Sequence, residues 1–423
     1  MSTATKSAST RMATAFRSGR TRTRLGDLAR FINGDAYKPS DWSTCGAPII
    51  RIQNLNDASK PFNYWAGALS ECVVVRAGDV LLAWSGTPGT SFGAHRWAGP
   101  DGVLNQHIFR VDLNTKLVDP DWFVFAVNEA LHVLIAKAHG GVGLRHVNKG
   151  EVEQLELNLP PLKEQERIAA WLTAGMAEVE QARQAAQARL RASEALTESY
   201  RREVFGDVHP FTASPLIPTE PTRPGWRWCL LTNIARLATG HTPSRREPMW
   251  WGGDIQWLQL PDIRAVDGKR VFTTQEQTNA LGIANSSSVL LPEGTVCMSR
   301  TASVGFVTIM GRAMATSQDF VNWICGPELD PEFLMQLLIA CRKPIRALGS
   351  GATHHSIYFQ TVESFAICVP PIADQHHIAT ELSERLVSAE QLTRAIQSEL
   401  QAIESLPSSL VRQAFGATED RHE

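Results

Sequence analysis

The sequence predicts a mixed α/β (α+β) fold, in which two similar globular domains with twisted β-sheets are separated by two long helices. The main observation is an internal repeat: residues 159–168 (Leu-Pro-Pro-Leu-Lys-Glu-Gln-Glu-Arg-Ile) return as residues 369–378 (Val-Pro-Pro-Ile-Ala-Asp-Gln-His-His-Ile). The offset of 210 residues holds without a gap from Val152 to Gly206. A repeat of this length fixes the architecture, so we expect a duplicated unit of about half the chain.

Each copy of the repeated stretch predicts a strand that stops at two prolines and continues as a helix. Leu155, Leu157 and Leu159 alternate with polar residues, which is the period of a half-buried strand. The proline pair that follows removes amide donors and ends the strand. Pro161 then suits the first position of a helix, and Glu164 suits its first turn.

A chain of 423 residues is too long for one ordinary core, and the repeat divides it. The predicted organisation is a disordered basic arm (1–24), a first globular domain (25–160), a long central helix (161–206), a Pro-rich linker (207–224), a second globular domain (225–370), a C-terminal long helix (371–416) and a tail (417–423). The arm carries six basic and no acidic residues, with little apolar content.

The first globular domain is expected to contain several short strands and one helix. The strands are predicted at 48–52, 72–75, 80–84 and 107–111, and the helix at 122–137 after an N-cap aspartate and a proline. The second domain repeats this order, so that Gly240 corresponds to Gly34 and Gln318 to Gln106.

The two long helices show the three-four spacing of a coiled-coil seam. Helix 163–205 would be about 64 Å long at about 1.5 Å per residue, and the second helix is expected to break near Pro407. A pseudo-twofold axis would make the pair antiparallel; the alternative is that each helix packs only on its own domain. The residues predicted for the seam or for a partner interface are Pro161, Gln165, Ile168, Leu172, Val179, Ala182, Pro371, Gln375, Ile378, Leu382, Ala389, Ile396 and Ile403.

Composition limits the class of protein. The seven cysteines are scattered without a C-x-x-C pair, and there is no apolar run of about 18 residues or secretory leader, so we expect a cytoplasmic protein without a membrane span. Residues 25–160 carry 11 basic and 14 acidic side chains, and residues 225–371 carry 12 and 11. Neither domain could hold DNA by phosphate neutralisation alone.

Catalytic motifs are absent in any fitting context. There is no phosphate-binding glycine loop of the Walker or dinucleotide type, and no H-E-x-x-H. The match to G-x-S-x-G at residues 89–93 follows a proline and lies in a predicted loop, not between a strand and a helix. We therefore expect a binding protein with no catalytic, cofactor or metal residues of its own.

The repeated Pro-Pro-x-x-x-Gln motif, placed at the start of a long helix after each of two half-chain α/β domains, resembles the specificity subunit of type I restriction–modification enzymes. Residues 78–86 and 105–109 in the first domain, and 299–301 and 316–319 in the second, are similar to this family too. The likeness covers residues 25–416. Residues 373–377 depart from the usual Glu-Gln and basic pair in the second copy.

The resemblance implies that each domain recognises one half of a split DNA sequence. The helices would fix the gap between the half-sites and dock two methyltransferase subunits, which in turn bind motor–nuclease subunits. S-adenosylmethionine, ATP and magnesium would be bound by those partners. The loop donors nominated for DNA contact are Lys38, Ser85, Thr87, His95, Arg96, Arg145, His146, Lys149, Arg245, Arg246, Ser299, Arg300, Thr301, Thr353, His354 and Tyr358.

Two alternatives stay open at this point. The chain could be the specificity module of a related restriction system (type IIB- or IIG-like) that serves a fused methyltransferase–nuclease. It could also be a coiled-coil scaffold that binds proteins and not DNA, which predicts no sequence-selective DNA binding.

Overall fold

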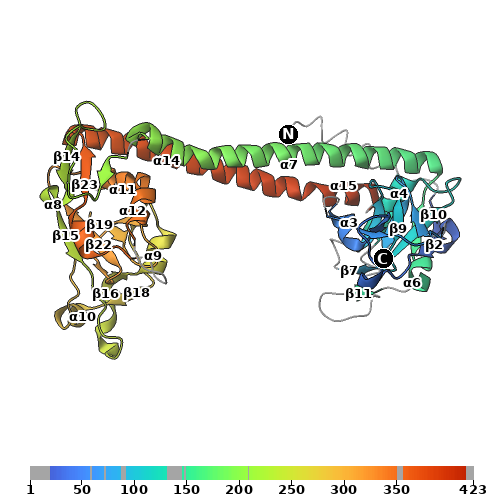
Figure 1. The fold of residues 1–423 in the computed structure, drawn as a ribbon, viewed down its shortest axis with the longest axis horizontal. Helices are drawn as coiled ribbons and strands as arrows, with labels where there is room; N and C mark the ends of the chain where they lie inside the picture. Colours follow the sequence, from blue (N-terminus) through green and yellow to red (C-terminus); the bar gives the residue numbers. More distant parts are fainter. Residues whose placement is uncertain are drawn as a thin grey trace, which may run out of the picture. The chain divides into compact units, whose positions relative to one another are not determined.

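The structure is a computed structural model that describes residues 20–57, 60–70, 73–86, 92–130, 145–146, 149–207, 209–349 and 356–415. The chain divides into unit 1 (residues 1–186 and 399–423) and unit 2 (residues 187–398), which are described separately (Figure 1). The boundary between the units falls inside the long helix α7 (Leu162–Phe205) and inside α14 (Ile372–Glu404). No helix in the described ranges is long and apolar enough to span a membrane.

Unit 1 contains two four-stranded sheets and two two-stranded sheets. Their orders are β2-β10-β6-β8, β4-β3-β9-β5, β1-β12 and β11-β7. The strands are β1 (Thr21–Arg24), β2 (Ala29–Asn33), β3 (Ala47–Ile50), β4 (Asn63–Trp65), β5 (Val74–Val75), β6 (Val80–Ala83), β7 (Ser85–Gly86), β8 (Gly93–Arg96), β9 (Gly102–Leu104), β10 (Ile108–Leu113), β11 (Arg145–His146) and β12 (Glu156–Leu159). The helices besides α7 are α2 (Leu25–Leu28), the 3-10 turn η1 (Pro39–Asp41), α3 (Ile52–Asn56), α4 (Pro120–Glu129), α6 (Lys149–Glu153) and α15 (Leu406–Phe415).

Unit 2 repeats this topology with additions. Its sheets have the orders β15-β22-β19-β20-β17, β18-β16-β21 and β13-β23-β14. The strands are β13 (Phe211–Thr212), β14 (Arg227–Leu230), β15 (Ala235–Thr239), β16 (Trp251–Leu258), β17 (Arg270–Val271), β18 (Glu276–Thr278), β19 (Val296–Ser299), β20 (Val307–Met310), β21 (Ala315–Thr316), β22 (Phe320–Cys325) and β23 (Ala366–Val369). The helices besides α14 are α8 (Leu231–Ile234), the 3-10 turn η3 (Pro248–Trp250), α9 (Leu260–Ala265), α10 (Ala280–Ala284), α11 (Pro331–Ala340), α12 (Arg342–Ala347) and α13 (Phe359–Glu363).

The two units share strand order as well as sequence, which confirms the predicted duplication. The order β15-β22-β19-β20 corresponds strand by strand to β2-β10-β6-β8, and β18-β16-β21 corresponds to β4-β3-β9. The parallel pairing is shared as well, since β3 pairs parallel with β9 in unit 1 and β16 pairs parallel with β21 in unit 2. The pseudo-twofold relation between the domains stays a prediction.

A glycine allows the two sheets of each unit to approach each other. A Cβ on Gly34 would lie 2.2 Å from the Leu104 carbonyl oxygen, and one on Gly240 would lie 2.1 Å from Thr316 Oγ1. Such distances are shorter than any van der Waals contact, so only glycine fits. The predicted correspondence of these two glycines therefore has the same physical reason in each unit.

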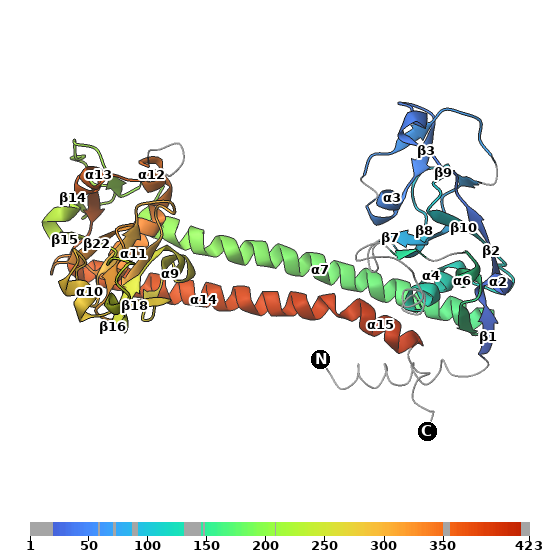
Figure 2. The same cartoon turned by 90° about the horizontal axis from the view of Figure 1, so that it is seen from below.

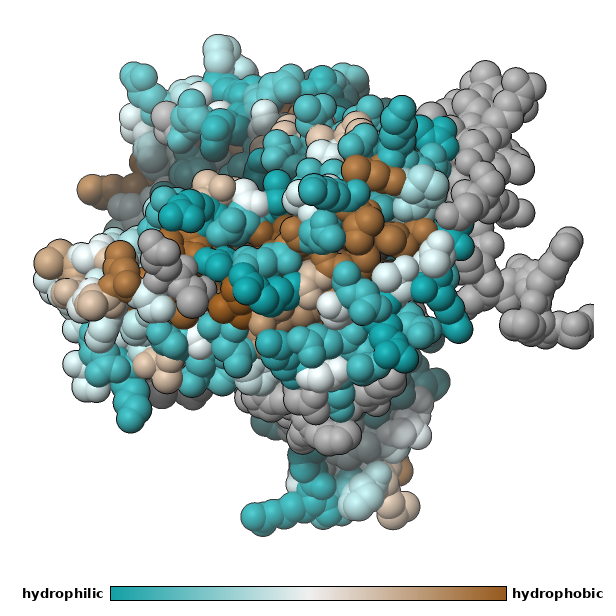
Figure 3. Space-filling model, turned by 90° about the vertical axis from the view of Figure 1, so that its right-hand side faces the viewer, coloured by the Kyte–Doolittle hydropathy of each residue, from teal (hydrophilic) through white to brown (hydrophobic). Residues whose placement is uncertain are grey.

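The cores lie between the larger sheets and the helices that cover them. In unit 1 the buried residues include Trp122 and Phe123 of α4, together with Ile168 and Leu172 of α7. Burial of large apolar side chains such as Trp122 and Phe123 stabilises each by about 1.5–3 kcal/mol. Other hydrophobic residues stay on the surface: Figure 3, which views the molecule from the right-hand side of Figure 1, shows them in brown, gathered in a band between teal hydrophilic ones.

Helix α7 pairs antiparallel with the C-terminal helices inside each unit. In unit 1, α15 lies against α7 and α4 (Figures 1 and 2), and Leu410 Cδ1 would be 3.1 Å from a Cβ at Gly175. In unit 2, Thr393 Oγ1 bonds Ser193 Oγ at 3.1 Å. The buried positions Leu382, Ala389 and Ile396 follow the predicted heptad.

The helix C-terminal to the second repeat breaks where proline was expected to break it. Helix α14 ends at Glu404 and α15 begins at Leu406, with Pro407 in its first turn. Proline has no amide hydrogen and its ring clashes with the preceding turn, so the helix restarts here.

Three predictions need correction. Ala182 is exposed, and Arg183 occupies the seam side instead, because α7 takes a four-residue step after Val179. Residues 21–24 form β1, paired with β12, and so are not part of a disordered arm; residues 1–19 lie outside the described residues. The Pro-rich linker predicted at 207–224 includes residues of the second domain, since β13 pairs with β23 and Phe211 packs on Phe365 at a ring distance of 4.8 Å.

Each long helix is joined to its own domain by a buried glutamine. Gln165 Oε1 accepts from Asp119 N at 2.9 Å, while Nε2 donates to the carbonyls of Leu117 at 2.9 Å and Pro160 at 2.8 Å. Gln375 makes the three equivalent bonds to Asp330, Glu328 and Pro370. Both side chains are fully buried. We therefore reassign them from the helix seam, where the sequence placed them, to the joint between helix and domain.

We predict that Gln165→Ala destabilises unit 1 by about 2–4 kcal/mol, because it removes a fully buried side chain and leaves three backbone groups, one of them buried, without their partner. Thermal unfolding followed by circular dichroism should show a lower Tm. The control is Gln184→Ala on the same helix, whose amide donates only to exposed Glu180 and should leave the Tm unchanged. Equal Tm values for the two variants would contradict the role of the glutamine joint.

Candidate nucleic-acid interface

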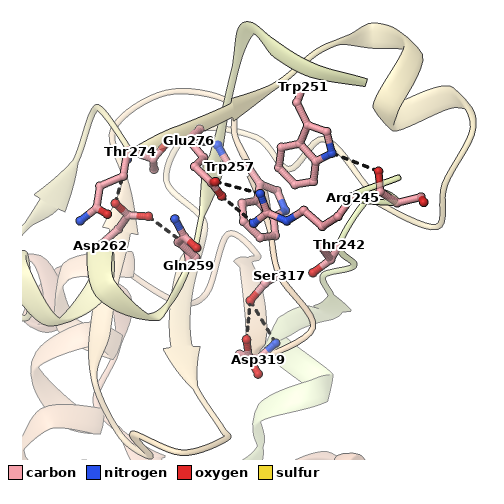
Figure 4. Close-up of polar contacts among 12 residues, drawn as sticks. Thr242, Arg245, Trp251, Trp257, Gln259, Asp262, Thr274, Glu276, Ser317 and Asp319 are labelled. Carbon is pink, nitrogen blue, oxygen red and sulfur yellow. Dashed lines mark hydrogen bonds and ion pairs between the residues drawn. The ribbon is translucent and has the colours of Figure 1, made fainter. Parts of the chain in front are cut away.

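A cation and two indole rings meet beside the sheet β18-β16-β21 in unit 2 (Figure 4). The guanidinium carbon of Arg245 lies 4.1 Å from the ring centroid of Trp251 and 5.1 Å from that of Trp257. The two indoles meet edge to face at 4.9 Å, and Trp251 Nε1 donates to the Ser244 carbonyl at 3.2 Å. Stacking on indole faces holds a planar guanidinium in a defined orientation.

Glu276 holds the same guanidinium from its end. Arg245 Nη1 and Nη2 donate to Glu276 Oε1 and Oε2 at 2.8 Å and 2.6 Å. These bonds raise the pKa of Arg245 and lower the pKa of the Glu276 carboxyl. The Glu276 carboxylate accepts one hydrogen from each of the two terminal nitrogens of Arg245. The Nε hydrogen and the second hydrogen of the terminal nitrogen beside it are therefore still available as donors. The Arg245 side chain is 51% exposed, so this donor edge can reach a ligand.

The backbone that carries Glu276 is fixed by buried polar groups (Figure 4). Thr274 Oγ1 donates to the Glu276 carbonyl at 2.6 Å. Asp262 Oδ1 accepts from Gln275 N at 2.9 Å, and its Oδ2 accepts from Gln259 N at 3.1 Å. Burial raises the pKa of the Asp262 carboxyl. The position of the carboxylate that holds Arg245 is thus set by the fold and not by the exposed side chains.

A second feature is the strained loop at residues 299–306. Ala302 has a φ of 51°, which L-residues other than Asn and Asp rarely adopt. The loop is held from inside by Ser299, whose Oγ donates to the Ser303 carbonyl and accepts from Phe306 N at 3.0 Å. Strain of this sort persists only where the surroundings fix it, and it concentrates at functional sites.

Three arginines hold the same loop from outside. Arg342 Nε donates to the Gly305 carbonyl at 2.7 Å, and Arg346 Nε donates to the Val304 carbonyl at 2.9 Å. Arg264 Nε donates to Ser303 Oγ at 2.8 Å. Arg300 and Thr301, nominated from the sequence, therefore lie on a rigid loop.

Comparison with known proteins identifies the family. Residues 20–187 and residues 225–402 each match the family described as the type I restriction modification DNA specificity domain. The chain belongs to this family. The two matched ranges are two specificity domains, and each includes the first part of the long helix that follows its sheets.

Curated relatives are also specificity subunits of type I restriction enzymes. The MjaIX specificity subunit of Methanocaldococcus jannaschii is 26% identical over 160 residues, which are 37% of this chain and 37% of that protein. The HindI specificity subunit of Haemophilus influenzae is 29% identical over 133 residues, which are 30% and 28% of the two chains. The matched part thus spans about a third of the length of these relatives.

Solved structures match nearly the whole chain. The HsdS subunit from Thermoanaerobacter tengcongensis has a TM-score of 0.65 at 18% identity and covers 95% of this chain and 97% of its own. A chain from a structural study of complex assembly and conformational transition in the type I restriction–modification system has a TM-score of 0.70 at 19% identity, with 94% and 98% covered. These similarities confirm the fold of both specificity domains with their long helices.

In the second specificity domain the nominated donors fall into different surroundings. Arg246 and Tyr358 are exposed, and Tyr358 is 65% exposed. Arg300 is half-buried; its Nη1 donates to the Ile357 carbonyl at 3.2 Å, and its Nε has no acceptor within the described ranges. Thr301 donates to Asp319. Thr353 and His354 lie outside the described residues.

Two serines must be removed from the nominated set. Ser299, the last residue of strand β19, is fully buried, and its hydroxyl donates to the Ser303 carbonyl of the loop. Ser85 in the first specificity domain is 4% exposed on β7, where its backbone pairs with His146. A buried hydroxyl cannot reach the edge of a base.

Three of the other donors nominated in the first specificity domain, Lys38, Arg96 and Lys149, are exposed. Lys38 is exposed beside the η1 turn, and Lys149 pairs with Glu153 at 3.7 Å. Arg96 Nε pairs with Asp121 Oδ1 at 2.9 Å. His95 is half-buried, Arg145 and His146 form the short strand β11, and Thr87 lies outside the described residues.

The sequence did not point to Glu276, Trp257 or the loop arginines. Glu276 is 31 residues from Arg245, so no local motif joins them. The adjacent tryptophans at 250 and 251 are the sequence signal for aromatic contacts in this region. Within the described residues, no cluster of three or more His, Cys, Asp or Glu side chains could hold a metal ion.

We predict that Ala302→Gly stabilises the second specificity domain by about 0.5–1 kcal/mol, because glycine adopts a positive φ without a Cβ clash. Ala284→Gly at the end of helix α10 is the matched control and should destabilise by a similar amount. Denaturant unfolding of both variants measures whether the free energy of unfolding rises or falls relative to the wild type. If Ala302→Gly also destabilises, the loop is not strained.

Proposed function

We propose that this chain is the sequence-specific DNA-recognition subunit of a type I restriction–modification complex. The observation that carries the proposal is the match of both halves of the chain to the DNA specificity domain family, with the fold retained over nearly the whole chain. Each specificity domain recognises one half of a bipartite site. The scaffold that binds proteins and not DNA has no comparable support.

Arg245 is the donor that the geometry favours for base recognition in the second specificity domain. Arginine makes bidentate contacts with the O6 and N7 acceptors of guanine in the major groove. Trp251 and Glu276 hold the guanidinium in place before DNA binds, so little side-chain freedom is lost on binding. Contact with bases by a fixed donor also suits a domain whose net charge is close to zero.

The partners and cofactors follow from the family. We propose that the long helices dock two methyltransferase subunits and set the gap between the half-sites, and that motor–nuclease subunits join through those methyltransferases. S-adenosylmethionine, ATP and magnesium would be bound by these partners, this chain having no catalytic role. The expected compartment is the cytoplasm, where host DNA lies.

The first test is a methylation map of the host genome with and without this gene. Base methylation at one two-part motif should disappear with the gene and return when it is restored. Exchange of residues 25–160 for the corresponding domain of another family member should then change one half of the motif only. An unchanged map, in cells where the methyltransferase partner is expressed and bound, would remove the DNA-recognition role.

We predict that Arg245→Ala lowers selectivity at one G·C pair of one half-site by about 1–3 kcal/mol, since a bidentate base contact is lost. Competition binding with duplexes that differ at single positions measures this change. The matched control is Arg312→Ala, an exposed arginine of the same unit that is not among the residues nominated for DNA contact. Equal selectivity of the two variants would mean that Arg245 does not contact a base.

A further inference from the structure

A basic cavity lies in unit 2, and none of the residues nominated for base contact is among its lining residues. It has a volume of about 510 Å³ and lies between the C-terminal end of α7, the end of α11, and α12. Its basic lining residues are Arg201, Arg202, His209, Arg342, Lys343 and Arg346. Only two lining residues, Glu198 and Asp207, are acidic. The cavity is large enough for a small phosphorylated ligand.

The contacts inside the cavity leave positive charge unbalanced. Arg342 is neutralised by Asp267, whose two oxygens both accept from Nη2 at 2.7 Å. Arg201 is half-buried and donates from Nε to the neutral amide of Gln336 at 3.0 Å. Burial and then repulsion by Arg342 lower the pKa of Arg201. A guanidinium stays charged in proteins, so a partly buried one without a bonded carboxylate favours an anion beside it.

A neighbouring cavity shows that this charge is not a general property of the region. The second cavity, of about 750 Å³, shares Arg201 and is also lined by Lys269 and Arg270. There the cations are balanced by acidic side chains, and Lys269 and Arg270 bond Glu390 and Glu332 at 2.7 Å each. Only the cavity at the end of α7 has a clear excess of cations among these two.

The internal repeat supplies an independent argument. By the offset of 210 residues, Arg201 corresponds to Val411. Aligned on the N-cap aspartates Asp119 and Asp330, the residues matching Arg342, Lys343 and Arg346 are Leu131, His132 and Ile135. At these four positions the first copy carries no arginine or lysine, so the cations are not a general feature of the repeated sequence. Their presence in the second copy points to a ligand.

We propose that this cavity binds a phosphoryl group. Clustered arginines and a lysine are the side chains that recognise phosphate oxygens by charge-assisted hydrogen bonds. The phosphoryl group can belong to a free phosphorylated molecule or to a DNA backbone, and the two sources share this chemistry. If the phosphoryl group belongs to DNA, the inference rests on the proposed function. If it belongs to a free molecule, the inference is independent of that function.

A ligand bound in the cavity would affect the strained loop at residues 299–306, because two residues contact both. Arg342 and Arg346 line the cavity and also hold the carbonyls of Gly305 and Val304. A phosphoryl group in the cavity would fix both guanidinium groups. It would therefore hold the loop that carries Arg300 and Thr301 in one position.

The test is isothermal titration of the full chain with inorganic pyrophosphate. We expect binding of one pyrophosphate per chain, weakened at least about tenfold in the double variant Lys343→Gln, Arg346→Gln, because two charge-assisted contacts are lost. Both side chains are exposed, so the variant should fold, and its circular dichroism spectrum checks this. Arg236→Gln on β15, also exposed and outside the cavity, is the matched control.

A duplex without the bipartite site distinguishes the two sources. If a backbone phosphate occupies the cavity, this duplex competes with pyrophosphate, and the double variant weakens DNA binding equally for all sequences. If the ligand is a free phosphorylated molecule, pyrophosphate binds unchanged in the presence of saturating duplex. Absence of pyrophosphate binding at millimolar concentration, or equal affinity in the double variant and the wild type, would overturn the proposal.

Discussion

Hydrogen bonding of a buried glutamine amide connects each long helix to its sheets. Gln165 and Gln375 each saturate one amide donor and two carbonyls, one of them from the proline pair that ends the preceding strand. A helix that begins at such a joint has a direction fixed by its own domain. The helices could otherwise pivot at the prolines, and their direction relative to the sheets of their own unit would be undefined. The repeated motif is thus a mechanical element, which explains why glutamine recurs at the same offset.

The DNA recognition proposed for this chain would depend on preorganised cations in near-neutral domains. Arg245 is held by an indole face and a carboxylate, while Arg300 lies on a loop fixed by Ser299, Arg342 and other donors. A few fixed donors can discriminate between bases, whereas a diffuse positive surface supplies affinity without selectivity. The near-zero net charge of each domain is therefore compatible with DNA recognition, provided that other proteins of the complex supply most of the affinity for the DNA backbone.

Much of the architecture could be predicted because two copies of a repeated sequence are expected to adopt the same fold. The strand before each proline pair, the long helices and the break near Pro407 all follow from local rules. The seam was predicted less well, because Ala182 is exposed although it is small and apolar, whereas Ala186 one turn later is fully buried. The candidate site was predicted least. Residues such as Glu276 approach Arg245 only after the sheet has formed, and no spacing rule in one sequence reports that contact.

The division of the chain has a consequence for the order of events during synthesis. Unit 2 is one continuous segment, whereas unit 1 combines residues 1–186 with residues 399–423. A ribosome therefore delivers the sheets of unit 1 first and the helix α15 that covers them last. Until then Trp122 and Leu172 lack the contacts they make with Phe415 and its neighbours. The nascent chain would therefore expose this apolar surface until α15 is synthesised. A chaperone or a binding partner that covers the surface during this time would prevent aggregation.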